Sequence, residues 1–166
     1  MSQIKVNSII PVAGVPTGGG GGIVQIVNAV ATSSMSTTST SFTDTNLTAT
    51  ITPTSASSKV LVYVSQSHRL RNTTANTAGA DIRLVRGSTD LVKGPDRYAI
   101  WRIISSGAID SFDRYNFHYL DSPNTTSATT YKTTCAVHST AMQFYAQPTG
   151  GTDDGASYIT LMEVSA

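Results

Sequence analysis

The sequence has little of what most enzymes and disulfide-rich scaffolds depend on. Charged residues make up 13% of its 166 residues, and it contains one glutamate, one tryptophan and one cysteine. A lone cysteine excludes an intrachain disulfide, which fits a protein made in a reducing cytoplasm. With a single glutamate, the acid pair of a glycosidase would have to come from aspartates, and no aspartate pair in the sequence indicates one.

The sequence also lacks a large excess of positive or negative charge, and it lacks a long apolar run. The formal net charge is +1, and no basic or acidic run forms a tail, so we expect no nucleic-acid partner. No stretch approaches the ~18 uninterrupted apolar residues of a membrane span. The first fifteen residues are polar and interrupted by Pro11, unlike a secretory signal. We therefore expect a soluble protein without membrane insertion.

What the sequence does contain is β-structure in short segments. Serine and threonine account for 46 residues, and 39% of the chain is hydrophobic, mostly in period-two alternation separated by turn residues. We find no amphipathic helix. The predicted strands cover 23–31, 42–52, 59–71, 81–94 (a hairpin), 98–105, 112–121, 131–138, 142–148 and 157–164. This pattern predicts an all-β fold, an antiparallel β-sandwich of jelly-roll type, with a closed barrel as the alternative.

Several segments carry more specific predictions. Residues 23–31 are apolar on both faces, so this strand should be covered on both sides. Residues 33–41 are a polar Ser/Thr run, a loop or a sheet edge, and 72–80 read as an exposed loop. In 42–52 one face carries the inward side chains, Leu47, Ala49 and Ile51. The hairpin at 81–94 should turn Ile82 and Leu84 inward.

Residue types that carry chemistry occur without the spacing that chemistry needs. The glycine run lacks a following Gly-Lys-Ser/Thr and leads into a strand, which excludes a phosphate-binding loop. His68, His118 and His138 fall on different predicted strands, where we expect polar-face side chains and no metal site. Cys135 should be a buried, inert thiol. We expect no catalytic residues, no metal and no cofactor.

One stripe of aromatic side chains suggests an interface. Tyr115, Phe117 and Tyr119 alternate on one face of the 112–121 strand. Such a stripe could stack bases or sugars, but at strand spacing it is more typical of a core or of a subunit face. We list these three residues as subunit-interface candidates.

Four segments together resemble a known family. They are SQIKVNSIIPVAG (2–14), GGGGGIVQIV (18–27), STTSTSFTDTNLTATITPTSASSKVLVYVS (36–65) and SYITLMEV (157–164). They are similar to small β-rich structural proteins of tailed bacteriophages of the marine and cyanophage type, found in tail fibres, collar or baseplate appendages and head decorations. Residues 68–157 carry no matching motif. The resemblance implies a usually trimeric virion protein, assembled in the host cytoplasm, with no catalytic residues to carry over.

The resemblance also implies an extended N-terminal arm, residues 1–22, ahead of a sandwich domain, 23–166. Alternation in the arm favours a strand that adds to a partner's sheet edge, with the virion-anchor candidates Ile4, Val6, Ile9 and Ile10. The five glycines suit a hinge or a close backbone approach at a three-fold axis, with a plain disordered tether as the alternative: Gly18, Gly19, Gly20, Gly21 and Gly22.

The function expected from these features is a non-enzymatic virion protein: a trimeric tail-fibre-like or baseplate appendage with distal loops that touch the host surface. Its partners would be further copies of itself, other virion proteins bound through the arm, and a host polysaccharide or receptor. The receptor-loop candidates are Asn72, Asn76, Arg97, Asn124, Asp153 and Asp154; the last two could also bind calcium, although a solvated turn is the commoner outcome. A head decoration protein and a lectin-like carbohydrate-binding module are the alternatives.

Overall fold

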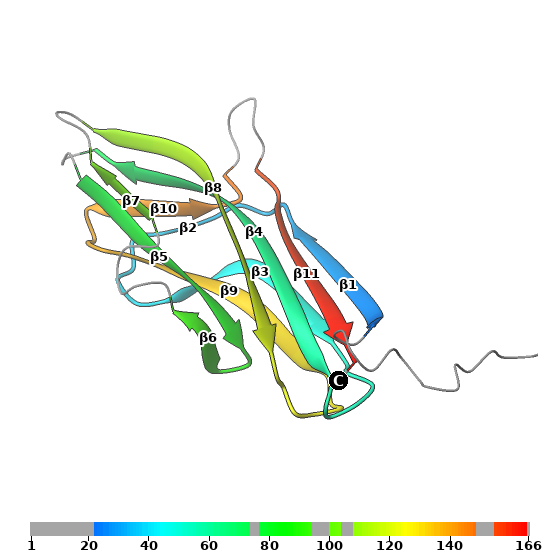
Figure 1. Cartoon of the computed structure of the whole chain (residues 1–166). Helices are drawn as coiled ribbons and strands as arrows, with labels where there is room; N and C mark the ends of the chain where they lie inside the picture. Colours follow the sequence, from blue (N-terminus) through cyan, green and yellow to red (C-terminus); the bar gives the residue numbers. More distant parts are fainter. Residues whose placement is uncertain (1–21, 74–76, 94–99, 104–107, 149–154, 166) are drawn as a thin grey trace, which may run out of the picture.

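The computed structural model describes residues 22–73, 77–93, 100–103, 108–148 and 155–165, and this part of the chain is all β (Figure 1). None of the described segments forms a helix long and apolar enough to cross a membrane. The strands are β1 Ile23–Ala31, β2 Met35–Thr37, β3 Thr43–Ile51, β4 Lys59–Asn72, β5 Thr77–Arg86, β6 Thr89–Lys93, β7 Ile100–Ile103, β8 Ile109–Asp121, β9 Thr129–Val137, β10 Met142–Ala146 and β11 Ser157–Val164.

The strands form two antiparallel sheets with jelly-roll order. In sheet A, β1 pairs with β11, β11 with β4, and β4 with β8, while β10 and then β2 continue from the far end of β4. Sheet B has the order β3-β9-β5-β6, and β7 also pairs with β5. The pairs β1/β11, β3/β9, β4/β8 and β5/β6 therefore alternate between the sheets, which is the jelly-roll arrangement. The predicted fold class is confirmed.

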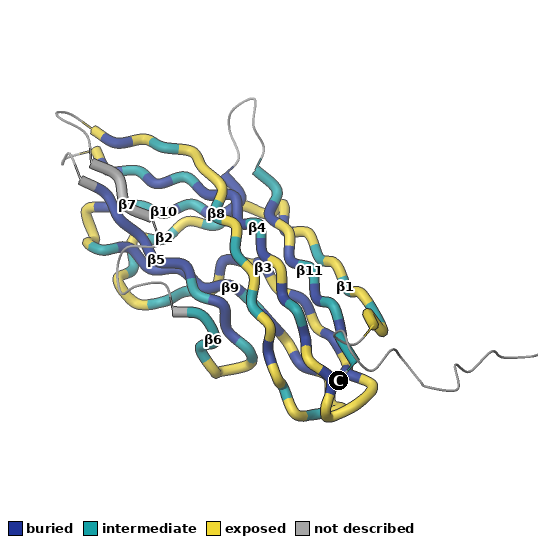
Figure 2. The backbone as a smooth tube through the Cα atoms, in the orientation of Figure 1, coloured by how far each residue is buried: buried dark blue, intermediate teal, exposed yellow. Residues whose placement is uncertain are grey.

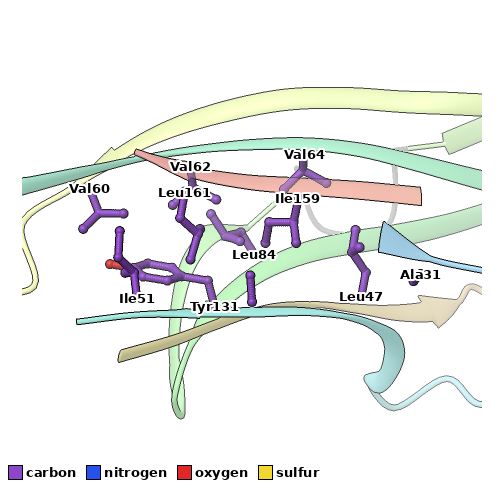
Figure 3. Packing of buried hydrophobic residues seen from close by; sticks show 11 residues of the cluster. Ala31, Leu47, Ile51, Val60, Val62, Val64, Leu84, Tyr131, Ile159 and Leu161 are labelled. Atoms are coloured by element: carbon purple, nitrogen blue, oxygen red, sulfur yellow. The ribbon is translucent and has the colours of Figure 1, made fainter. Parts of the chain in front are cut away.

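Alternating side chains from both sheets fill the space between them. Val60, Val62 and Val64 of β4 point from sheet A toward Leu47 and Ile51 of β3 (Figure 3). Each of these side chains is at most 1% exposed, and full burial of one contributes about 1.5–3 kcal/mol. The inward positions predicted for Leu47, Ala49, Ile51, Ile82 and Leu84 are confirmed.

Some of the many threonines and serines lie inside the sandwich and join the sheets. Gln66 of β4 accepts a hydrogen bond from Thr133 Oγ1 of β9 at 2.9 Å and donates through Nε2 to Ser157 Oγ of β11 at 2.8 Å. Thr45 of β3 contacts the same group. Because these polar atoms satisfy one another, their burial does not carry the cost of unpaired groups.

The prediction that residues 23–31 are covered on both sides is wrong. One face of β1 packs on the core, but on the other face Ile26 is 59% and Val30 52% exposed. The reason is topological: β1 is an edge strand of sheet A, and no described segment lies over the outer face of that sheet. Within the polar run 33–41, the three-residue β2 lies at a sheet edge, as expected.

The prediction of an exposed loop at 72–80 holds for Thr73, which is exposed between strands, but is wrong for Asn72 and for residues 77–80. Asn72 ends β4 and is 1% exposed, and β5 begins at Thr77 with Ala78 and Ala80 in the core. Alanine and glycine have low strand propensity, but here small side chains fit where β5 packs close to Phe144 and Leu70. Packing thus outweighs local preference.

The arrangement of the ends matters for any binding role. Ser165 N donates to Gly22 O at 3.0 Å, and Val164, Lys59 and Asp121 lie at the same end of their strands. The start of β1, the C-terminal residues and the 122–128 connection therefore share one end (Figure 1). The end of β4 and the start of β5 lie at the other end, so residues 1–21 join the sandwich opposite the β4–β5 connection.

Candidate interaction surface

The outer face of sheet A carries a continuous apolar row. In register across β1, β11, β4 and β8 lie Ile26, Met162, Leu61 and Leu120. Adjacent strands are ~4.8 Å apart, so neighbouring side chains in the row touch. Ile26 is 59% and Leu120 48% exposed, and Met162 and Leu61 are half-buried.

Further apolar side chains extend this row along the strands. We call the whole set the apolar face; it consists of Ile23, Ile26, Val30, Leu61, Tyr63, Leu120, Tyr158 and Met162. Figure 2 shows exposed residues alternating along β1 and β8 at the two edges of this sheet. Half-exposed side chains of this size add up to an area on the order of several hundred Å², a range in which exposed apolar patches mark interaction sites.

The outer face of sheet B has the opposite character. Its exposed positions on β3 and β9 are polar, and they pair with one another across the strands. Lys132 Nζ lies 2.8 Å from Asp44 Oδ2, and the hydroxyls of Thr50 and Thr130 are 2.8 Å apart. The sequence therefore gives sheet B a polar outer face. The apolar face of sheet A is a local departure from that pattern.

Lys59 is exposed beside the apolar face, two residues before Leu61 on the same side of β4, and one ion pair lies further along the outer face of sheet A. The guanidinium of Arg69 lies between the rings of Phe112 and Tyr145, 5.0 and 5.1 Å from their centroids. Its Nε and Nη2 donate to the two carboxylate oxygens of Asp110 at 2.6 and 2.5 Å. The hydrogen bond from Arg69 lowers the pKa of the Asp110 carboxyl despite opposing desolvation, and the same bond raises the pKa of Arg69. Neither charge is left to repel an approaching apolar surface.

The predicted subunit-interface residues point the other way. Tyr115, Phe117 and Tyr119 lie on the inner face of β8, are half-buried and pack against the two core clusters. The ring centroids of Tyr115 and Phe117 are 5.3 Å apart. These residues and the apolar face are therefore on opposite sides of sheet A, and the interface role of the three aromatic side chains stays a prediction.

Most other predicted site residues lie outside the described residues: Ile4, Val6, Ile9, Ile10, Gly18, Gly19, Gly20, Gly21, Asn76, Arg97, Asp153 and Asp154. Gly22 is described, and a Cβ placed there would meet nothing within 4 Å, so no contact with the described residues requires glycine. Asn124 is exposed with a φ of 52°, at the end where residues 1–21 join. Asn72 is buried, so its predicted place in an exposed loop is wrong.

The histidines do not converge on a site. His118 is exposed on the outer face of sheet A, as expected for a polar-face residue. His68 is instead 3% exposed and stacks on Phe144 with 5.7 Å between centroids, so the expectation of a polar-face position is wrong for it. Among the residues that the structure describes, no three His, Cys, Asp or Glu side chains gather to hold a metal ion.

Cys135 is buried in the core, as the sequence predicts. Burial raises the pKa of its thiol to about 12. Because the thiolate is the reactive form, we expect a soluble thiol reagent to modify the native protein at least about a hundredfold more slowly than the unfolded protein. Rapid modification of the native chain would contradict this placement of Cys135.

A hollow of about 560 Å³ opens on sheet B and is lined by Thr40, Phe42, Asp81, Arg83 and His138, among others. The Arg83 guanidinium lies 3.4 Å from the centre of the Phe42 ring. Its described lining residues include one carboxylate and no cysteine, so they do not form the acid pair of a glycosidase or a cysteine nucleophile.

Fold and surface together define a jelly-roll β-sandwich with an apolar outer face. No family model matches the chain, and no curated protein matches it. Among solved structures it is similar to the VP2 subviral particle of infectious bursal disease virus, at 12% identity over 87% of this chain with a TM-score of 0.37. T=1 particles derived from the same virus give 10% identity over 86% with a TM-score of 0.37, and the Gx strain gives 12% over 84% with 0.35. The chain spans 38–39% of those chains, and similarity at this level establishes no family.

Proposed function

We propose that the protein is a non-enzymatic structural component of a tailed-bacteriophage particle, a homotrimeric tail-fibre-like or baseplate appendage. The observation that carries the proposal is the apolar face of sheet A. An exposed apolar surface of this kind is typical of a protein interface, and its side chains include no catalytic group. The assignment to a phage particle is supported by the resemblance to phage structural proteins of residues 2–14, 18–27, 36–65 and 157–164.

A second copy of the chain is the simplest occupant of the apolar face. Stable interfaces bury about 800 Å² per partner, and their centres are apolar and poor in charge. The side chains that make up the apolar face are uncharged, and the nearest charged side chains, Lys59 and Arg114, lie at its margin. Three copies that turn the face toward a common axis would remove it from water in all of them, and the glycines of residues 18–22 would allow close backbone approach near such an axis.

The two ends of the sandwich suit different tasks. Residues 1–21 join at the end that carries Asn124, so an arm that anchors the protein leaves the opposite end free. That free end holds the β9–β10 turn, with Ser139, Thr140 and Ala141 exposed, and the β4–β5 connection that contains Asn76. We place host-surface contacts there, because loops on a rigid sandwich tolerate variation.

Immunogold labelling of purified particles tests this function. The proposal predicts gold at the tail or baseplate. Gold over the head would support the decoration alternative and contradict the appendage, and particles without label would contradict a virion role. In parallel, the isolated oligomer should bind host cells. The variant Thr140→Arg should weaken that binding about tenfold, as loss of one well-packed contact does, whereas Ser127→Arg, at an exposed position of the other end, should leave it unchanged.

A further inference from the structure

One edge of β8 pairs with β4, and the other edge has no partner strand among the described residues. The pairing with β4 runs through 13 consecutive residues, from Ile109 to Asp121, without a register shift. The other edge strands are shorter or irregular: β2, β6 and β7 have three to five residues, and the pairings of β1 and β3 contain a register shift. An edge this long and regular is a template for another strand.

Two of the charged side chains of β8 are turned away from this edge. Natural proteins often protect an edge strand with charged side chains or bulges. Arg114 of β8 instead reaches back across sheet A, donating to Ser65 Oγ at 3.0 Å and to Ala156 O at 3.0 Å, with its guanidinium 5.8 Å from the Tyr158 ring. Asp110 is held by Arg69 of β4. Asp113 differs, because its Oδ1 accepts from the backbone N of Arg114 at 2.8 Å and so occupies a backbone donor of β8. We expect an incoming backbone to pair with the part of the edge beyond this point, from Tyr115 to Asp121.

The inner side of the same edge is incompletely covered. Tyr115, Phe117 and Tyr119 pack on the core but remain only half-buried. A strand added beside β8 would place every second side chain next to these rings. Apolar side chains at those positions would bury the remaining aromatic surface.

A segment of the chain outside the described residues has the required pattern. In residues 3–10, QIKVNSII, strand alternation puts Ile4, Val6, Ser8 and Ile10 on one face and Gln3, Lys5, Asn7 and Ile9 on the other, and the first proline comes at Pro11. Eight residues in a strand span about 27 Å, less than the length of β8 at ~3.4 Å per residue. We infer that residues 3–10 of a second copy add as a strand to the free edge of β8, with Ile4 and Val6 against the inner aromatic side chains.

The choice of a second copy comes from the proposed oligomer. β1 and β8 are opposite edges of sheet A, with β11 and β4 between them, so they lie about 14 Å apart. Residues 11–21 span at most ~36–40 Å, which is enough to reach β8 of the same chain or of a neighbour. This inference rests on the proposed function for the presence of neighbouring copies, but it uses a different surface from the apolar face.

A mixed disulfide tests the inference directly, because Cys135 is buried and does not interfere. Differently tagged Asn7→Cys and acceptor chains are unfolded together, refolded as mixed oligomers and oxidised. The acceptors are Asn116→Cys and His118→Cys on β8, with Thr50→Cys on the exposed edge strand β3 as the matched control. We expect a disulfide-linked dimer that carries both tags with at least one of the two β8 acceptors. This disulfide should form at least about tenfold faster than the one between Asn7→Cys and Thr50→Cys. No β8 cross-link, or equal rates at β3, would overturn the inference.

Amide exchange provides the second measurement and separates the two proposals. In the full chain, exchange of 109–121 should be at least about tenfold slower than after deletion of residues 1–17 or in the double variant Ile4→Asp, Val6→Asp. The control variant Gln3→Asp, Asn7→Asp adds the same charge on the other face and should retain protection. If the deletion leaves both the exchange of β8 and the oligomer mass unchanged, the arm inference fails while the proposed function stands. Protection of β8 in a monomer would instead overturn the second copy as occupant.

Discussion

Replacing Ile26 and Leu120 together by aspartate is expected to convert the oligomer into folded monomers of 17.4 kDa. The two residues stand at opposite ends of the apolar row, are 59% and 48% exposed, and contribute nothing to the core between the sheets. In an interface they would be buried, where two unpaired carboxylates per chain cost several kcal/mol. In the free chain they would face water, so the unfolding temperature of the isolated subunit should change little. Light scattering measures the mass, and circular dichroism reports whether the fold is retained.

The matched control places the same charges on the other outer face. Thr48 and Thr50 of β3 are exposed on sheet B, and the double variant Thr48→Asp, Thr50→Asp should remain an oligomer. Dissociation of both double variants would point to general charge repulsion. An oligomer that survives Ile26→Asp, Leu120→Asp would show that the apolar face is not the subunit contact.

Glu163→Ala is expected to be the most damaging single substitution near the chain ends, lowering the free energy of unfolding by about 2–4 kcal/mol through the donors it leaves unsatisfied. Glu163 of β11 is fully buried. Its Oε1 accepts from the backbone N and the hydroxyl of Thr54 at 2.8 and 2.7 Å, and its Oε2 accepts from Gln25 Nε2 at 2.6 Å. The carboxylate thereby ties β1, β11 and the β3–β4 turn together. Urea unfolding at fixed protein concentration measures the loss.

The same carboxylate makes stability depend on pH. Burial acts to raise its pKa, but hydrogen bonds from Gln25, Thr54 and Ser58 outweigh burial and lower the pKa from 4.5 to about 2. Because the folded pKa lies below the unfolded value, the contribution is fully present above 4.5 and is lost as pH falls toward 2. Glu163→Gln, which cannot titrate, should therefore lose less stability than the wild type between about pH 6 and pH 2.5.

A separate control shows that the effect belongs to this buried group. Asp44→Asn removes an exposed partner of Lys132 on sheet B, and exposed ion pairs contribute about 0–1 kcal/mol. This variant should be within that range of the wild type at neutral pH. If Glu163→Ala costs no more than Asp44→Asn, the described hydrogen bonds do not stabilise the closure of the sandwich.

The strands could be predicted from sequence because alternation is a local signal. The pattern at Leu47, Ala49 and Ile51 is set by burial of one strand face, and it is visible without knowledge of the partner strand. The half-buried face of Tyr115, Phe117 and Tyr119 was visible in the same way. The number and spacing of such segments predict a sandwich of jelly-roll type, which the structure confirms, whereas the strand order comes only from the structure.

The apolar face could not be found this way, because it exists only after four strands align. Ile26, Met162, Leu61 and Leu120 come from segments up to 136 residues apart and meet only through the register of β1, β11, β4 and β8. The sequence did show that residues 23–31 are apolar on both faces. The error was to assume that an apolar face must be covered within the same chain, when an edge strand can present it to another.

Position at the two ends also depends on topology. Asn124 and Asn76 both read as loop residues in the sequence. Strand order puts the 122–128 connection, with Asn124, at the end that holds Gly22, whereas β4 ends and β5 begins, on either side of Asn76, at the opposite end. Similarly, His68 follows a polar pattern in sequence yet is buried, since β4 continues past β11 and is covered there by Phe144 of β10. Non-local packing decides both placements.

The most direct test of self-association through the apolar face is the molar mass of the full-length wild-type chain by light scattering over a range of concentrations. The account predicts a stable multiple of 17.4 kDa, three copies for the proposed trimer, that falls to one copy in Ile26→Asp, Leu120→Asp. A wild-type mass of 17.4 kDa at every concentration would contradict the account.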